Sequence, residues 1–191
     1  MTYARIQTTD NRPSGDFPLA EIISGHPGYA GLLLLSGPGQ TGFLLTLWKS
    51  REDAELASSR TRAAAGPPPV DLTYDAVYEV EEDLPGETGP ASVALVGWFD
   101  GPLSPARIAL ARRRGREVVH PALRSVPGRV RSLVLWQPSQ LGFVIVHLAS
   151  SSDGLAAIGA TVRSLPVRPD EDPALLTGPD RLSQYQVVAE G

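Results

Sequence analysis

The sequence predicts an α+β fold built from two copies of one unit, each with the element order βαββαβ. The main observation behind this prediction is an internal repeat. A shift of 100 residues aligns residues 27–61 with residues 127–161 without a gap, and 12 of these 35 positions are identical. Roughly two or three identities would arise by chance at average residue frequencies. A shift of 90 aligns the upstream segments, so the second copy carries about ten extra residues between Ser104 and Pro127.

A change in composition at residues 83–91 is the second observation. This segment, DLPGETGPA, combines Pro, Gly and acidic residues, which is typical of a domain boundary. With 191 residues, the chain is long enough for two small domains. We therefore predict an N-terminal repeat at residues 1–84 and a C-terminal repeat at residues 90–191.

The strands and helices of the two copies follow from local patterns. β-branched and aromatic residues predict the strands, and turns rich in Gly, Pro and Ser join the central pair in each copy. Ser104 and Pro105 are suited to begin the long helix of the second copy. The first copy is predicted as strand 2–9, helix 18–24, strands 30–36 and 42–48, helix 52–64 and strand 71–81. The second copy is predicted as strand 92–99, helix 105–125, strands 130–136 and 142–148, helix 153–164 and strand 182–190.

This order of elements is that of the ferredoxin-like unit. The helices of such a unit cover one face of its sheet, so the other apolar face needs a second layer. Two such sheets in one chain can cover each other. The sequence thus predicts a single-chain, pseudo-dimeric α+β barrel. This favours a monomer, with a further homo-oligomer as the alternative.

Composition excludes several classes of protein. The absence of Cys excludes disulfides, thiolate metal sites and a Cys nucleophile, and a net charge of −4 gives no reason to expect nucleic acid binding. The first 16 residues lack the apolar segment of a signal peptide, and no apolar run approaches the roughly 20 residues that span a bilayer. No phosphate-binding glycine loop or hydrolase motif occurs, and no metal site is predicted. We expect a cytoplasmic protein without a membrane partner.

Two segments of the first copy resemble a known family. The first is His26-Pro27-Gly28-Tyr29-Ala30-Gly31, a Pro-Gly helix exit, and the second is Trp48-Lys49-Ser50-Arg51-Glu52-Asp53-Ala54, which follows an apolar strand. Together they are similar to the antibiotic biosynthesis monooxygenase family of the dimeric α+β barrel superfamily. The likeness covers about residues 2–81. The second copy matches the first copy better than it matches the family, so a tandem arrangement accounts for nearly the whole chain.

The resemblance implies a cofactor-independent monooxygenase that acts on a small aromatic or polyketide-type compound. In such chemistry a phenol or enol loses a proton, its anion reacts with O2, and a protein group protonates the peroxide. Family members also include haem-degrading proteins, isomerases and quinol oxidases, so the fold alone does not decide the function. The alternatives are a non-catalytic ligand-binding or structural protein and, as a third hypothesis, haem binding through a single His. The expected partner is a small hydrophobic or aromatic molecule.

Trp48 matches the strand Trp of the family, and the resemblance implies a catalytic role for its indole N–H. The family's polar partners of this Trp are replaced here by Leu44 and Ala54. Leu44 is predicted to line the substrate site beside Trp48. The structural alternative is a core Trp that closes the gap between sheet and helix. The alignment pairs Trp48 with Leu148, which removes this site from the second copy.

The histidines of the second copy supply the predicted acid–base group. His120 lies at the border of the apolar stripe of helix 105–125, next to Pro121, which should kink or restart the helix. We predict it as the catalytic acid or base, and the structural alternative is a residue at the border of the apolar stripe without a catalytic role. Strand alternation places His147 on the face opposite Leu148, and hence opposite the position aligned with Trp48. His147 is predicted either to contact the substrate or to be a buried, neutral core histidine.

Two further features have structural and functional interpretations. Trp98, on the first strand of the second copy, is predicted to line a pocket for a flat ligand, and the alternative is that it only fills volume. The cluster Arg112, Arg113, Arg114 and Arg116 could meet an anionic ligand, but the favoured interpretation is a solvated helix face.

Overall fold

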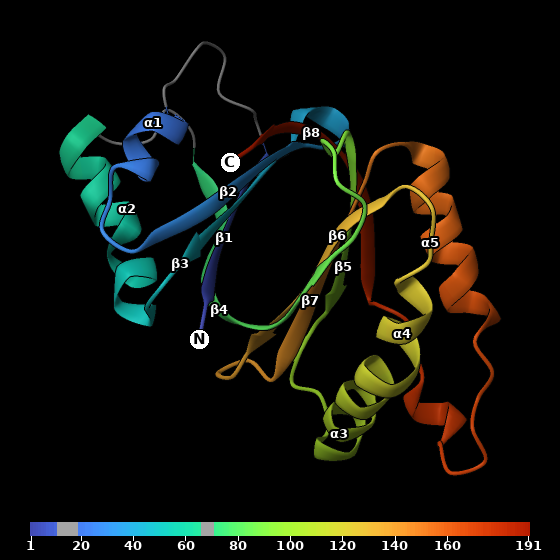
Figure 1. Ribbon diagram of the computed structural model, residues 1–191. Helices are drawn as coiled ribbons and strands as arrows, with labels where there is room; N and C mark the ends of the chain where they lie inside the picture. The colour runs from blue at the N-terminus through green and yellow to red at the C-terminus, as the bar shows by residue number, and fades with distance from the viewer. Residues whose placement is uncertain (11–18, 66–70) are drawn as a thin grey trace. The chain divides into compact units, whose positions relative to one another are not determined.

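The structure of the protein, a computed structural model, describes residues 1–10, 19–65 and 71–191 (Figure 1). These residues form two compact units. The first comprises Met1–Val80 and Gln184–Gly191, and the second comprises Glu81–Ser183. Residues 184–191, which are the last residues of the predicted second repeat, therefore lie in the first unit. Among the described helices, none has both the length and the apolar character needed to cross a membrane.

The first unit is an antiparallel sheet with two helices. Its elements are β1 (Tyr3–Thr9), α1 (Leu19–Ser24), β2 (Tyr29–Ser36), the 3-10 turn η1 (Pro38–Gln40), β3 (Gly42–Trp48), α2 (Arg51–Ala65), the first part of β4 (Leu72–Pro85) and most of β8 (Arg181–Glu190). The strand pairs β4–β1, β1–β3, β3–β2 and β2–β8 are all antiparallel. The predicted strands and helices are confirmed, and the strand expected to end at Glu81 continues to Pro85. Pro18, the expected first residue of the first helix, lies outside the described residues.

One face of this sheet packs against both helices. Trp48 at the end of β3 is fully buried there, against Ile23 of α1 and against Ala54 and Ala57 of α2. Leu44 lies in the same cluster. Because side chains alternate along a strand, every second residue of β3 up to Trp48 faces the helices.

The second unit repeats this order of elements with a longer helical segment. Its elements are β5 (Val93–Phe99), α3 (Pro105–Arg114), the π-helical segment η2 (Gly115–Val119), α4 (His120–Leu123), β6 (Arg129–Gln137), β7 (Gly142–Ala149), α5 (Ser152–Ser164) and the 3-10 turn η3 (Pro173–Leu175). The strands β5, β7 and β6 pair antiparallel in that order. The predicted elements of this copy are confirmed. The predicted α+β class is confirmed as well.

The helical segment 105–123 changes its winding just before Pro121. Ser104 caps its start, because the Ser104 hydroxyl accepts a hydrogen bond from the Arg107 amide, and Pro105 follows the cap. Proline has no N–H, and its ring crowds the carbonyl four residues earlier. The preceding turn is accordingly π-helical, and the His120 amide bonds to the Gly115 carbonyl five residues back. The predicted irregularity of the helix beside Pro121 is confirmed, and α4 begins at His120.

The register of β7 overturns one prediction. Tyr3 pairs with Trp48 in the first unit, whereas Val93 pairs with Ala149 in the second, so Ala149 and not Leu148 occupies the position of Trp48. Between equivalent strand positions the second hairpin has one residue more than the first, six between Trp136 and Phe143 against five between Ser36 and Gly42. A slip of one residue exchanges the two faces of a strand. The expectation that His147 faces away from the position of Trp48 was therefore wrong. His147 lies on the helix-covered face of its sheet, where the first unit has Thr46.

Candidate functional site

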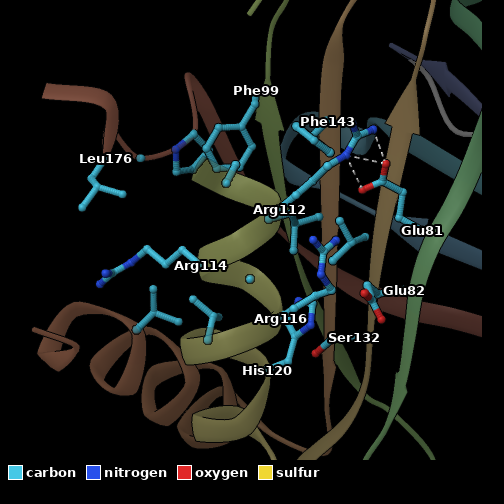
Figure 2. Close-up of a pocket in the computed structure, with 18 of the residues that line it drawn as sticks. Glu81, Glu82, Phe99, Arg112, Arg114, Arg116, His120, Ser132, Phe143 and Leu176 are labelled. Atoms are coloured by element: carbon cyan, nitrogen blue, oxygen red, sulfur yellow. Dashed lines mark hydrogen bonds and ion pairs between the residues drawn. The ribbon is translucent and has the colours of Figure 1, made fainter. Parts of the chain in front are cut away.

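A cavity of about 420 Å³ lies in the second unit, between the helical segment 105–123 and the sheet (Figure 2). This volume is within the range of small-molecule sites. The helical segment, parts of β4 to β7, the end of α5 and the chain between α5 and β8 form its walls. Most of the wall is apolar, with Phe99, Leu103, Val119, Leu123, Val134, Phe143, Ile145, Leu175 and Leu176 among its residues.

The helical wall of the cavity comes from a stretch of the chain without a counterpart in the predicted first repeat. The extra residues of the second copy fall between Ser104 and Pro127, within the stretch that forms α3, η2 and α4. In the first unit the described helix at this place, α1, has only six residues. The side chains that face the cavity from the helix thus come from a helical segment that is longer in the second unit than in the first.

A Ser–His pair forms the polar floor of the cavity. The Ser132 Oγ of β6 and the His147 Nδ1 of β7 lie 2.8 Å apart, because the two residues are direct partners across the strands. Burial, together with the smaller effects of Arg129 and His120, lowers the pKa of His147 from its ordinary 6.5 to about 4. The His147 ring is therefore neutral at neutral pH, and it offers a hydrogen-bonding group rather than a charge.

Arg129 is a buried cation held by carbonyl groups. Its side chain donates to Leu123 O at 2.7 Å, to Leu84 O at 2.9 Å and to Pro85 O at 2.8 Å, and only 2% of the residue is exposed. It makes no ion pair with a described carboxylate. A positive charge of this kind disfavours a second positive charge nearby, so it helps to keep His147 neutral.

His120 faces the cavity from the helical side (Figure 2). Partial burial is the main cause that lowers its pKa below the ordinary value; Glu82 opposes this effect, and Arg116 and Arg124 add to it. The ring packs against the helix itself, since a Cβ built on Gly115 would lie 3.3 Å from the His120 Nε2. A neutral imidazole at this place can accept a proton from a ligand hydroxyl.

Most of the arginines on the helical segment are paired, which corrects the expectation of a solvated basic face. The Arg112 Nε donates to Glu81 Oε1 at 2.9 Å, and its guanidinium lies 4.5 Å from the centre of the Trp136 ring. Arg114 pairs with Glu171, whose side chain is only 1% exposed. Long side chains of this kind bury their stems and find acceptors across the fold, which a helical pattern does not reveal.

Arg116 differs from its neighbours on the helix. It lines the cavity, its residue surface is exposed, and it makes no ion pair or hydrogen bond with any residue in the described ranges. Glu82, across the cavity, likewise has no side-chain partner among the described residues. Ser132, Arg116 and Glu82 were not predicted from the sequence. Only the pairing of β6 with β7 could have indicated Ser132, because it lies 15 residues from His147 in the chain.

The predicted site residues separate into two groups. His120 and His147 meet at the cavity. Trp48 and Leu44 lie in the core of the first unit, where the Trp48 Nε1 donates to Thr46 Oγ1 at 2.8 Å. Trp98 is 6% exposed, with the Arg181 guanidinium 4.7 Å from its ring centre, and it is not among the residues that line the cavity.

The donor groups of the site limit what it could hold. The described residues contain no group of three or more His, Asp or Glu side chains that could bind a metal ion. For haem, a single neutral imidazole is a suitable axial ligand, and His120 is the residue that would provide it. A hydroxylated aromatic ring requires apolar walls and a few polar groups at one end, and the cavity supplies both.

Comparisons with known proteins agree with this architecture. No family model and no curated protein sequence matches the chain. Similar solved structures include a candidate monooxygenase from Fusobacterium nucleatum, with a TM-score of 0.67, 9% identity and coverage of 99% of this chain and 93% of the other. An anthrone oxidase-like protein gives a TM-score of 0.62, 17% identity and coverage of 100% and 92%. A ferredoxin-fold protein related to antibiotic biosynthesis monooxygenases, from Listeria monocytogenes, gives a TM-score of 0.57 and 12% identity. This match covers 99% of this chain and 95% of the other.

A heme-degrading enzyme from Listeria monocytogenes is also structurally similar to the chain. At these identities the comparisons establish the fold, which is shared with ferredoxin-fold and monooxygenase-like proteins, and they leave the chemistry to the site.

Proposed function

We propose that the chain is a monooxygenase-like protein that binds a small hydroxylated aromatic compound in the cavity of its second unit and oxidises it with O2. The observation that carries this proposal is the meeting of His120 and the Ser132–His147 pair at one polar end of an apolar cavity. The proposal applies to the second unit, because the first-unit residues Trp48 and Leu44 lie in a packed core.

The residues divide the chemistry between them. His120 accepts the proton of a phenol or enol, which leaves the electron pair on the ring. The carbon of this anion forms a bond to O2, and the resulting peroxide takes the proton back from His120. Loss of water from the hydroperoxide breaks the O–O bond and leaves a carbonyl, so that a CH2 group and O2 give C=O and H2O. Ser132 and His147 orient the ligand by hydrogen bonds, and the apolar walls exclude water.

The low basicity of His147 supports a second candidate function. With a pKa of about 4, this ring takes up little proton charge at neutral pH, which suits a hydrogen-bond partner better than a base. If His120 also only binds, the protein is a carrier or sensor of the same ligands. Haem binding through His120 is the third candidate.

Oxygen uptake with anthrones and hydroquinones tests the proposal. We expect the protein to consume O2 with at least one compound, and we expect His120→Asn to lower the rate by roughly 10²-fold, a typical contribution of a general base. The matched control is His26→Asn, because His26 lies in the first unit and bonds to Thr61. If a broad panel of phenols consumes no O2 but binds, the carrier function replaces the enzyme. A Soret shift on titration with haem would favour the third candidate.

We further propose that residues 1–84 and 90–191 are copies of one ferredoxin-like repeat and form a single-chain pseudo-dimer. The 12 identities in 35 aligned positions and the shared element order support this proposal. Such a chain needs no partner copy, so light scattering should give the mass of a monomer, 20.3 kDa. A dimer at micromolar concentration would contradict this expectation.

A further inference from the structure

The charges around the cavity do not cancel. Glu81 is neutralised by Arg112, and Arg114 is neutralised by Glu171. Arg107 lies over the Phe99 ring at 5.8 Å, at the side of the cavity. The remaining positive charges near the two histidines are those of Arg116, Arg124 and the buried Arg129. The remaining negative charge is that of Glu82. The polar end of the cavity therefore carries an excess of positive charge.

Arg116 is the member of this group that a ligand can reach. It lines the cavity and has no hydrogen-bond or ion-pair partner in the part of the chain that the structure describes. Figure 2 shows Arg116 and His120 entering the cavity from the same helical segment. Residues four apart on a helix lie on one face, so the guanidinium and the imidazole can contact two groups of one small molecule.

The chemistry of these groups selects a ligand class. A guanidinium presents a planar pair of N–H donors that matches the two oxygens of a carboxylate. The apolar walls suit an aromatic ring, and a neutral imidazole suits a hydroxyl group. We propose that the cavity binds an aromatic acid, with its carboxylate on Arg116 and its hydroxyl at His120. This inference rests on the proposed function only in using the same cavity, and it makes Arg116 the residue that determines specificity.

Calorimetric binding of two matched probes tests the inference. The probes are 4-hydroxybenzoate and 4-hydroxybenzamide, which share shape and hydroxyl group and differ in charge. We expect the acid to bind at least tenfold more tightly than the amide at pH 7. Arg116→Gln should abolish this preference and leave the affinity for the amide within twofold. The control is Arg113→Gln, since Arg113 pairs with Asp170 and does not line the cavity.

Equal affinities of the native protein for the two probes, or no binding of either, would overturn the inference. So would an equal loss with Arg113→Gln, because this would show a general effect of surface charge. The binding assay needs no turnover, which separates this inference from the proposed function. If the acid binds through Arg116 but no compound consumes O2, the inference stands and the oxygenase proposal fails. If neutral phenols are oxidised and Arg116→Gln has no effect, the reverse holds.

Discussion

The ion pair between Arg114 and Glu171 holds the chain after α5, which forms one wall of the cavity, against the helical segment. The Glu171 carboxylate accepts from the Arg114 guanidinium and from the Arg168 amide at 2.9 Å, and Arg114 also donates to Leu165 O and Pro166 O. These contacts attach the chain after α5 to the helical segment. The perturbation we consider is Glu171→Gln, which keeps the shape of the side chain and removes its charge.

The expected loss of stability follows from burial. Removing one partner of a buried ion pair costs about 3 to 5 kcal/mol, because the other charge stays buried without compensation. The Glu171 side chain is 1% exposed, but Arg114 is 13% exposed and keeps its two carbonyl partners. We therefore expect a loss at or just below the lower limit of this range, about 2 to 3 kcal/mol. For a chain of this size this corresponds to a fall in Tm of roughly 4 to 12 °C.

Denaturant unfolding at pH 7, followed by circular dichroism, measures this change. The control is Asp170→Asn at the adjacent position, where the pair with Arg113 has exposed fractions of 60% and 40%. Exposed pairs contribute about 0 to 1 kcal/mol, so this variant should unfold almost as the native protein does. Equal losses in the free energy of unfolding of the two variants, or a loss below about 0.5 kcal/mol for Glu171→Gln, would refute the conclusion that this ion pair stabilises the fold.

Three further changes have defined outcomes. Gly115→Ala should leave stability nearly unchanged, because alanine favours the helix by about 1 kcal/mol, whereas its added Cβ would lie 3.3 Å from the His120 Nε2. NMR titration should then show a displaced His120 ring. Gly159→Ala is the control and should leave the His120 ring in place. Folding lowers the pKa of His147 from 6.5 to about 4, so the free energy of unfolding should fall by about 3 kcal/mol as the pH drops from 6.5 to 4. His147→Gln should flatten this pH dependence, and an unchanged slope would contradict the assignment. Trp48→Phe should cost about 2 kcal/mol through the lost indole hydrogen bond and leave ligand affinity unchanged; a loss of affinity would restore Trp48 as a site residue.

Local patterns in the chain were sufficient for much of the secondary structure. Ser104, Pro105 and the hydrophobic periodicity indicated the start of the long helix, and Pro121 indicated its interruption. These signals act between residues close in the chain, so they can be recognised without tertiary structure. For the same reason His120 could be chosen as the acid–base candidate, since its place on the helix follows from the helical period.

The partners of these residues could not be predicted in the same way. The acceptors of Arg112 and Arg114 lie 31 and 57 residues away in the chain, and their approach depends on how the strands and the loop before β8 pack. The alignment also misled at β7. Its identities stay in step with a shift of 100, whereas β7 pairs as if shifted by 101. Five residues separate the paired Ser36 and Gly42, and six separate the equivalent pair Trp136 and Phe143.

The sequence by itself determined the order of strands and helices along the chain, and that His120 lies on a helix beside an apolar stripe. The tertiary structure alone decided that His147 faces that helix, that Ser132 is its partner, and that the cavity lies in the second unit rather than beside Trp48. The physical reason is that helical periodicity is a property of neighbours in the chain. The face of a strand, by contrast, depends on its register with another strand, and a single residue in a hairpin is enough to reverse it.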